Sequence, residues 1–92
     1  MQLATVVGQV IATAKAPALG GLPLQVVEPY PAVPDADAYV AVDLVGAGDG
    51  EVVLVVTGSG ARAATPGDAP VDAAIVAIVD TVVLAGRAAY SK

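Results

Sequence analysis

Short runs of β-branched residues, cut apart by glycine and proline, restrict this chain to a fold built from short strands. Short apolar runs bounded by turn residues are typical of β-strands rather than of helices. The runs of this kind cover residues 3–13, 24–27, 39–45, 51–57 and 75–83. The sequence therefore predicts five strands and no long helix.

Five short strands in 92 residues predict a single, mainly β domain. We expect a small five-stranded OB-like β-barrel with a short helical turn at residues 71–74, and a sandwich is the alternative. Residues 73–83 could also form a buried helix, although their length and β-branching favour a strand.

Two strands carry further information about packing. Gly8 lies in the middle of the first strand, and a glycine there predicts the bend or bulge that barrels need at their corners. Residues 51–57 are apolar at both alternating sets of positions. A strand that is buried on both sides, or that lies at a subunit contact, has this pattern.

The apolar content is high for so small a chain. Hydrophobic residues make up 57% of it and charged residues 14%, whereas about 25% of an ordinary soluble domain is charged. One small core cannot bury this much apolar surface, so we expect self-association. No apolar run reaches the roughly 18 residues of a membrane helix, and the N-terminus lacks the basic region of a signal peptide.

The chain lacks the residue types that several classes of function require. The chain has no histidine and no cysteine, which excludes the usual catalytic triads and zinc sites. A net charge of −5 with four basic residues and three tyrosines disfavours nucleic acid, which is bound through basic and stacking side chains. We therefore expect no catalytic residue, no cofactor, no metal and no nucleic-acid or membrane partner.

The aspartates divide into two groups by their neighbours. Turn or solvation roles are predicted for the group beside glycine or proline, which consists of Asp35, Asp37, Asp49 and Asp68. The second group lies in or beside apolar runs and consists of Asp43, Asp72 and Asp80. A charge in such a place is rarely left unpaired, so a structural partner is favoured over catalysis. That partner is expected to be Arg62, a backbone N–H or a neighbouring subunit.

A glycine-containing segment follows the fourth predicted strand. Residues 58–63 read Gly-Ser-Gly-Ala-Arg-Ala and fit the loose dinucleotide-binding pattern G-x-G-x-x-G/A. That pattern needs a helix directly after the glycines, and residues 64–67, Ala-Thr-Pro-Gly, are predicted to leave no room for one. We therefore expect residues 58–70 to form a surface loop, or a loop repeated around a symmetry axis.

Six segments in order resemble the pentameric vertex proteins of bacterial microcompartments, the EutN/CcmL family, over nearly the whole chain. They are Gly8–Lys15, Leu19–Leu24, Ala41–Gly48, Gly50–Val55, Gly58–Arg62 and Pro70–Asp80. Two positions depart from the pattern of the family. Gly60 replaces its usual second serine, and Ala77 stands where glycine is common.

The resemblance implies a structural shell protein in the cytoplasm and not an enzyme. It implies an OB-like barrel in residues 1–86 with a flexible tail at 87–92, assembled as a cyclic homopentamer that caps five-fold vertices among hexameric and trimeric shell proteins. It further implies that Gly58, Ser59, Gly60, Ala61 and Arg62 border an axial pore. Candidate charged anchors, within or between subunits, are Asp43, Arg62 and Asp72.

Two alternatives come from other classes of protein. One is an OB-like module that binds a small ligand or an oligonucleotide. The other is a small enzyme that uses aspartate and tyrosine, which would require a pocket holding a carboxyl group of raised pKa.

Overall fold

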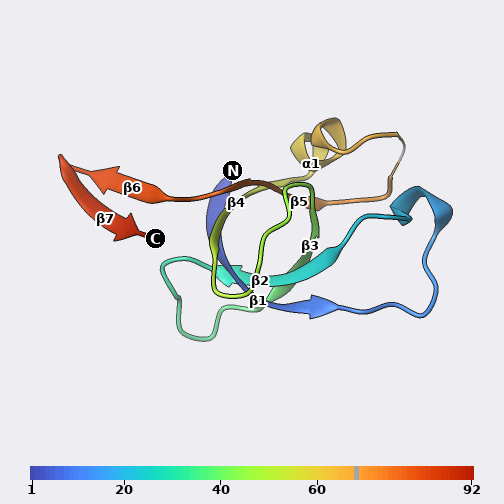
Figure 1. Ribbon diagram of the computed structural model, residues 1–92, viewed down its shortest axis with the longest axis horizontal. Coiled ribbons are helices and arrows are strands. Elements are labelled where there is room, and N and C mark those ends of the chain that lie inside the picture. Colours follow the sequence, from blue (N-terminus) through green and yellow to red (C-terminus); the bar gives the residue numbers. More distant parts are fainter. Residues whose placement is uncertain (68) are drawn as a thin grey trace.

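The structure, a computed structural model, describes residues 1–67 and 69–92, and five of its strands close into a barrel (Figure 1). The barrel strands are β1 Gln2–Val10, β2 Leu24–Pro29, β3 Tyr39–Asp43, β4 Val52–Thr57 and β5 Ala73–Ile78. The other elements are the 3-10 helix η1 Pro17–Leu19, helix α1 Ser59–Ala64, and the strands β6 Thr81–Leu84 and β7 Arg87–Ser91. The predicted five-stranded barrel is confirmed, and the sandwich alternative is wrong.

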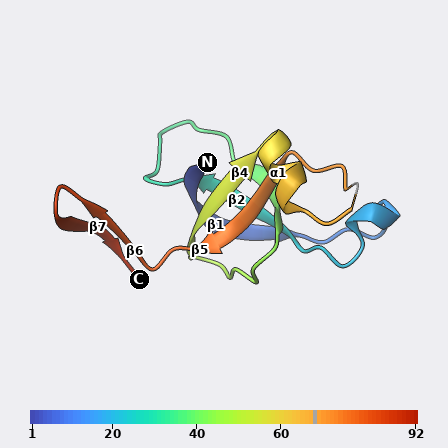
Figure 2. The same cartoon turned by 90° about the horizontal axis from the view of Figure 1, so that it is seen from above.

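The strands follow the order β1-β2-β3-β5-β4 around the barrel, and β1 closes it against β4. β3 and β5 pair in parallel, whereas the other neighbours pair antiparallel. Closure leaves the barrel no free edge at which another chain could add a strand. Helix α1 lies in the connection from β4 to β5 and covers the outer surface of the barrel (Figures 1 and 2).

Strand β1 reaches both of its neighbours because it bends. Residues 2–5 pair with β4, and residues 4–10 pair with β2. The register with β2 shifts between Val6 and Gly8, so the irregularity predicted at Gly8 is confirmed.

Small side chains fill the barrel interior. A barrel with so few strands leaves space only for such side chains, and the chain has no Phe and no Trp. The buried members of this cluster are Ala4, Val6, Val27, Ala41, Ala47, Val53, Val55, Ala73 and Ile75. Ile75 is the largest of the fully buried side chains.

A second apolar cluster lies outside the barrel, where α1 and the loop before β5 cover β3 and β5. Its buried members are Val42, Ala61, Ala69, Val71 and Ala74. Val56 of β4 packs against this second cluster, while Val53 and Val55 of the same strand point into the barrel. Of the two explanations given for the apolar pattern of residues 51–57, packing on both sides is therefore present, with Val56 half-buried on the outer side.

Two expectations between β4 and β5 are wrong. Residues 58–70 do not form a continuous loop because α1 begins at Ser59, and the helical turn expected at residues 71–74 is absent because β5 begins at Ala73. A helix of six residues is marginal by itself. Ala61 is fully buried in the second cluster, so packing against the barrel stabilises this helix.

The last apolar run, predicted as one strand or a buried helix, is divided between two sheets. β5 ends at Ile78, whereas β6 begins at Thr81 and pairs only with β7 among the described strands. The exposed Asp80 lies at the break. Both the single strand over residues 75–83 and the helix alternative are therefore wrong.

The flexible tail is expected at residues 87–92, and residues 87–91 form the strand β7. The turn between β6 and β7 consists of Ala85 and Gly86, which have φ angles of 50° and 78°. Two successive positive φ angles make the type I′ turn that suits the twist of a hairpin. The predicted boundary at residue 86 falls inside this turn, and Asn-Gly, the usual sequence signal for it, is missing.

Candidate functional site

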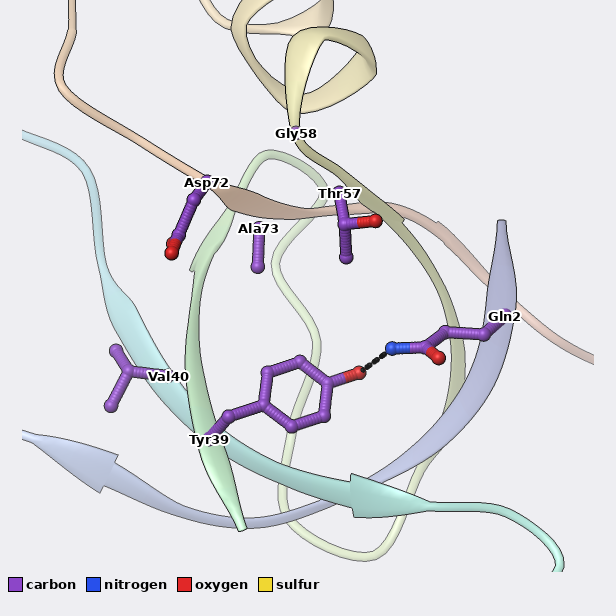
Figure 3. Close-up of a pocket in the computed structure, with 7 residues that line it drawn as sticks. All are labelled: Gln2, Tyr39, Val40, Thr57, Gly58, Asp72 and Ala73. Atoms are coloured by element: carbon purple, nitrogen blue, oxygen red, sulfur yellow. Dashed lines mark hydrogen bonds between the residues drawn. The ribbon is translucent and has the colours of Figure 1, made fainter. Parts of the chain in front are cut away.

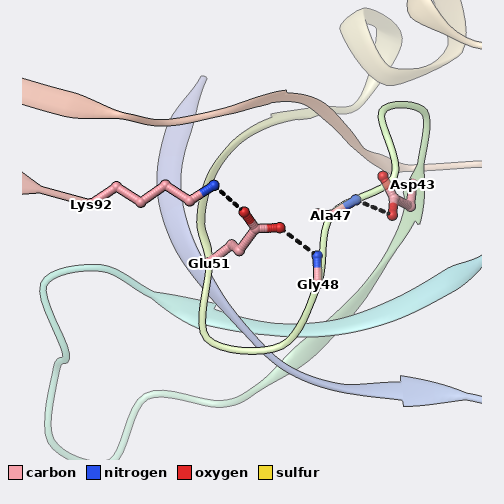
Figure 4. Close-up of polar contacts among 5 residues, drawn as sticks. All are labelled: Asp43, Ala47, Gly48, Glu51 and Lys92. Carbon is pink, nitrogen blue, oxygen red and sulfur yellow. Dashed lines mark hydrogen bonds and ion pairs between the residues drawn. The ribbon is translucent and has the colours of Figure 1, made fainter.

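Asp43 organises the turn that follows β3. Its side chain is buried, and Oδ1 accepts hydrogen bonds from the backbone N–H groups of Val45 at 3.0 Å and Gly46 at 2.9 Å. Oδ2 accepts a hydrogen bond from the N–H of Ala47 at 2.8 Å (Figure 4). These partners lie in the same chain, so the carboxylate of Asp43 holds the backbone of this turn.

Gln25, which sequence reasoning missed, completes this arrangement. It lies in β2, is buried, and its Nε2 donates to Asp43 Oδ2 at 3.1 Å and to the Ala47 carbonyl at 2.9 Å. A polar side chain inside an apolar strand needs such partners when it is buried. Its position between Leu24 and Val26 was the available signal.

Asp72 lies beside the open end of the barrel. A hollow of about 650 Å³ at this end is lined by Gln2, Tyr39, Val40, Thr57, Gly58, Asp72 and Ala73 (Figure 3). The ring of Tyr39 lies across the opening, and its hydroxyl accepts a hydrogen bond from Gln2 Nε2. Burial raises the pKa of Tyr39, although the hydrogen bond from Gln2 opposes this shift.

The hollow offers no cluster that would hold a metal. Across the described part of the chain, no three carboxylate side chains gather as a metal-binding group would require. Asp72 is exposed and is the only acidic residue among those that line the hollow.

Within the predicted axial segment, Gly58–Arg62, residues 59–62 are helical rather than part of a loop. Gly58 precedes α1, and its carbonyl accepts hydrogen bonds from the N–H groups of Ala61 and Arg62. Ala61 is buried, whereas Ser59, Gly60 and Arg62 are exposed. The expectation that no helix follows the glycines is wrong, but Gly60 and Ala63 lie inside the helix and not in a phosphate-binding loop before it.

The three predicted charged anchors are not brought together. Within residues 1–67 and 69–92, the one ion pair joins Lys92 to Glu51, so neither Asp43 nor Asp72 pairs with Arg62. Arg62 is exposed on the last turn of α1. Asp80 is exposed at the base of the hairpin, and Asp68, predicted to be a turn residue, lies outside the described residues.

The Glu51–Lys92 pair was also missed by sequence reasoning, because its members lie 41 positions apart. Glu51 follows the turn organised by Asp43 and also accepts a hydrogen bond from the N–H of Gly48 at 2.7 Å (Figure 4). The hydrogen bond from Lys92, followed by that from Gly48, lowers the pKa of Glu51, and the hydrogen bond to Glu51 raises the pKa of Lys92.

These shifts give a testable titration. Since its pKa is lowered, Glu51 stabilises the fold above the ordinary glutamate pKa of about 4.3. That contribution is lost as the pH falls through the lowered pKa. Lys92 contributes below the ordinary lysine pKa of about 10.4 and loses its contribution as the pH rises through the raised pKa.

We expect a carboxyl NMR titration of the intact protein to give Glu51 a pKa below the ordinary value, and Lys92→Gln to move that pKa upward. Lys15→Gln is the matched control, because Lys15 donates to the Leu22 carbonyl and not to a carboxylate. A pKa of Glu51 that is the same in both variants would contradict the pairing.

Gly58, directly before α1, and Gly60, inside it, should respond in opposite ways when each is replaced by alanine. Gly58 has φ 60° and ψ −133°, a conformation that other residues adopt at a cost of about 1–3 kcal/mol. Gly60 lies in the helix, and a Cβ there would meet Val56 Cβ at an ordinary 3.7 Å.

Gly58→Ala should therefore lower the free energy of unfolding by about 1–3 kcal/mol. Gly60→Ala should raise it by about 0.5–1 kcal/mol, because alanine favours helix. Urea unfolding of the two variants at one protein concentration checks the signs. If both variants changed the free energy of unfolding by the same amount and in the same direction, the described start of α1 would be contradicted.

The family model described as "Ethanolamine utilisation protein EutN/carboxysome" matches residues 1–80. The chain belongs to the EutN/CcmL family. The predicted family is therefore confirmed over the whole barrel.

Two curated relatives show how closely the chain follows the EutN/CcmL family. It is 47% identical to the bacterial microcompartment shell vertex protein GrpN of Rhodospirillum rubrum, over 89% of this chain and 96% of the relative. It is 45% identical to the carboxysome shell vertex protein CcmL of Synechocystis sp., over 100% of this chain and 95% of the relative.

Solved structures of the EutN/CcmL family share the fold. The ethanolamine utilization protein EutN superposes with a TM-score of 0.91 at 41% identity, covering 100% of this chain and 99% of that one. The GrpN pentameric microcompartment shell protein from Rhodospirillum rubrum superposes with a TM-score of 0.80 at 44% identity, covering 91% and 99%.

Membership of the EutN/CcmL family also decides the class of function. The named relatives are shell vertex proteins and not enzymes, which confirms the predicted structural role. In the described part of the chain, no helix combines the length and the apolar character needed to cross a membrane.

Proposed function

We propose that five copies of this chain form a closed ring that caps a five-fold vertex of a bacterial microcompartment shell in the cytoplasm. The observation that carries this proposal is the near-complete superposition on a protein named as a pentameric shell protein. The high apolar content of the chain, 57%, supports it, because one small core cannot bury that much apolar surface.

The role is geometric. A flat sheet of hexagonal tiles cannot close into a polyhedron unless some positions have five neighbours instead of six. A head-to-tail contact whose rotation closes after five copies produces such a unit. We propose that the neighbours in the shell are hexameric and trimeric shell proteins, which would contact the outer rim of the ring.

Native mass spectrometry tests the ring directly. Five copies of the 8.9 kDa chain give about 45 kDa. A stable monomer or dimer would contradict the proposal and would favour the ligand-binding alternative.

Co-expression with a hexameric shell protein then tests the vertex role. Electron microscopy should show closed shells with this chain, and open sheets or tubes without it.

Within the ring, we place Gly58–Arg62 around the central axis and Asp72 at a subunit contact. The exposed Ser59, Gly60 and Arg62 lie on one short helix, and this supports a shared role at the axis. Asp43 would act indirectly, by holding the turn after β3 within each subunit. This arrangement predicts an effect of Arg62 on assembly that is separate from its effect on folding.

Arg62→Ala should weaken pentamer assembly, yet change the stability of the subunit by no more than about 0.5 kcal/mol, because the side chain is exposed. Native mass spectra across a dilution series measure assembly, and Lys15→Ala is the control for loss of a positive charge. A pentamer as stable as that of the control, with unchanged shell capping, would contradict a role for Arg62.

A further inference from the structure

The β6–β7 hairpin projects from one end of the molecule (Figures 1 and 2). Val83 and Leu84 near its tip are 62% and 65% exposed. No third described strand pairs with this sheet, and a lone two-stranded hairpin is marginal in water. The tip therefore presents apolar side chains that its own chain leaves uncovered.

The base of the hairpin is fastened to its own barrel. The rings of Tyr30 and Tyr90 meet edge to face with centroids 5.4 Å apart. Lys92 pairs with Glu51, which directly precedes β4. The backbone N–H of Lys92 donates to the Asp80 carbonyl at 2.8 Å and closes the base of the hairpin itself. These contacts set the direction in which the tip points.

An apolar groove lies toward the opposite end of the molecule, where β3 and β5 start and where η1 lies (Figure 1). It is open to solvent, has a volume of about 220 Å³ and is lined by Leu19, Leu24, Val40, Val42, Pro70, Val71, Asp72 and Ala73. Val40 is 44% exposed although it is a strand residue. The groove adjoins the hollow of Figure 3, with which it shares Val40, Asp72 and Ala73.

The tip and the groove are complementary in size and in charge. A groove of 220 Å³ is below the roughly 300–1,000 Å³ of small-molecule sites. A cavity of about 150 Å³ already accepts benzene, so this groove suits one or two aliphatic side chains. Arg87 lies opposite Leu84 in the hairpin, and Asp72 is the one charged residue that lines the groove.

We propose that Val83, Leu84 and Arg87 of one subunit dock into this groove on a second copy of the chain, with Arg87 beside Asp72. A projection at one end and a groove toward the other form a head-to-tail contact, the kind that generates rings. This inference rests on the proposed pentamer and names the surfaces that build it. It also gives Asp72, predicted as an interface anchor, a partner of opposite charge.

A charge exchange tests the pairing. Arg87→Asp and Asp72→Arg should each raise the protein concentration needed for half-assembly at least about tenfold, because each places like charges together in the contact. The double variant should restore assembly. Asp37→Arg, in the exposed proline-rich loop, is the matched control. Circular dichroism of each variant verifies that the subunit is folded.

An apolar series tests the tip independently. Val83→Ser and Leu84→Ser should weaken assembly, whereas Val33→Ser should not, although Val33 is similarly exposed at 57%. Native mass spectrometry of the full chain reads out every variant at low and moderate salt.

The outcomes separate this inference from the proposed function. A pentameric wild type whose Arg87, Asp72 and Leu84 variants assemble normally would overturn the docking surface and leave the pentamer intact. Single variants that fail without rescue by the double variant would overturn the Arg87–Asp72 pairing. A wild type that is not pentameric would contradict the proposed function itself.

Discussion

Asp43→Asn is expected to lower the free energy of unfolding by about 2–5 kcal/mol. The NH₂ group of the new amide would face N–H groups that donate hydrogen bonds to the carboxylate of Asp43. Oδ1 accepts two backbone N–H groups, and Oδ2 accepts one more together with Gln25 Nε2. Whichever way the amide turns, its NH₂ meets two donors, and each buried donor left unsatisfied costs about 1–3 kcal/mol.

Asp49→Asn is the matched control for this prediction. Asp49 lies in the same connection between β3 and β4 but is exposed, so its substitution should change stability by no more than about 0.5 kcal/mol. Urea unfolding of both variants should be recorded at one protein concentration, since assembly stabilises the folded chain by mass action. Equal stabilities of the two variants would show that the carboxylate does not hold the turn.

Ile75→Ala is expected to cost about 2–5 kcal/mol, because it leaves a cavity in a barrel that has few other large side chains. Ile75 is 0% exposed and is the largest fully buried side chain. Ile75→Val should cost only about 0.5–1.5 kcal/mol, since one methylene is lost.

Ile11→Ala removes the same atoms from a side chain that is 85% exposed, and it should leave stability within about 0.5 kcal/mol. Thermal and urea unfolding of the three isoleucine variants measure this order. A cost for Ile11→Ala as large as that for Ile75→Ala would contradict the described core. For a domain stabilised by about 5–15 kcal/mol, Ile75→Ala removes a large share of the total.

The barrel strands could be predicted because their signals are local. Segments that contain glycine or proline separate the runs of valine, leucine and isoleucine. The apolar residues on both faces of residues 51–57 indicated two packing partners. The structure supplies both partners, with Val55 in the barrel and Val56 against the second cluster. Gly8 likewise marked the bend in β1 before any neighbour was known.

The candidate site was only partly predictable. Asp43 was expected to find a structural partner because a charge stands there in an apolar run. Its partner Gln25 and the Glu51–Lys92 pair were missed, because their members lie 18 and 41 positions apart. The residues of each pair come together only when the chain folds, so the sequence around them carries no local pattern that predicts the contact.

The sequence by itself determined the barrel strands, the lack of histidine and cysteine chemistry, and the family to which the chain belongs. Only the tertiary structure decided that residues 59–64 are helical, that the last apolar run divides at Asp80, and that residues 87–91 return as a strand. The physical reason is that a six-residue helix and a two-stranded hairpin are marginal alone. Each depends on contacts with distant residues, Ala61 in the second cluster and Tyr90 against Tyr30.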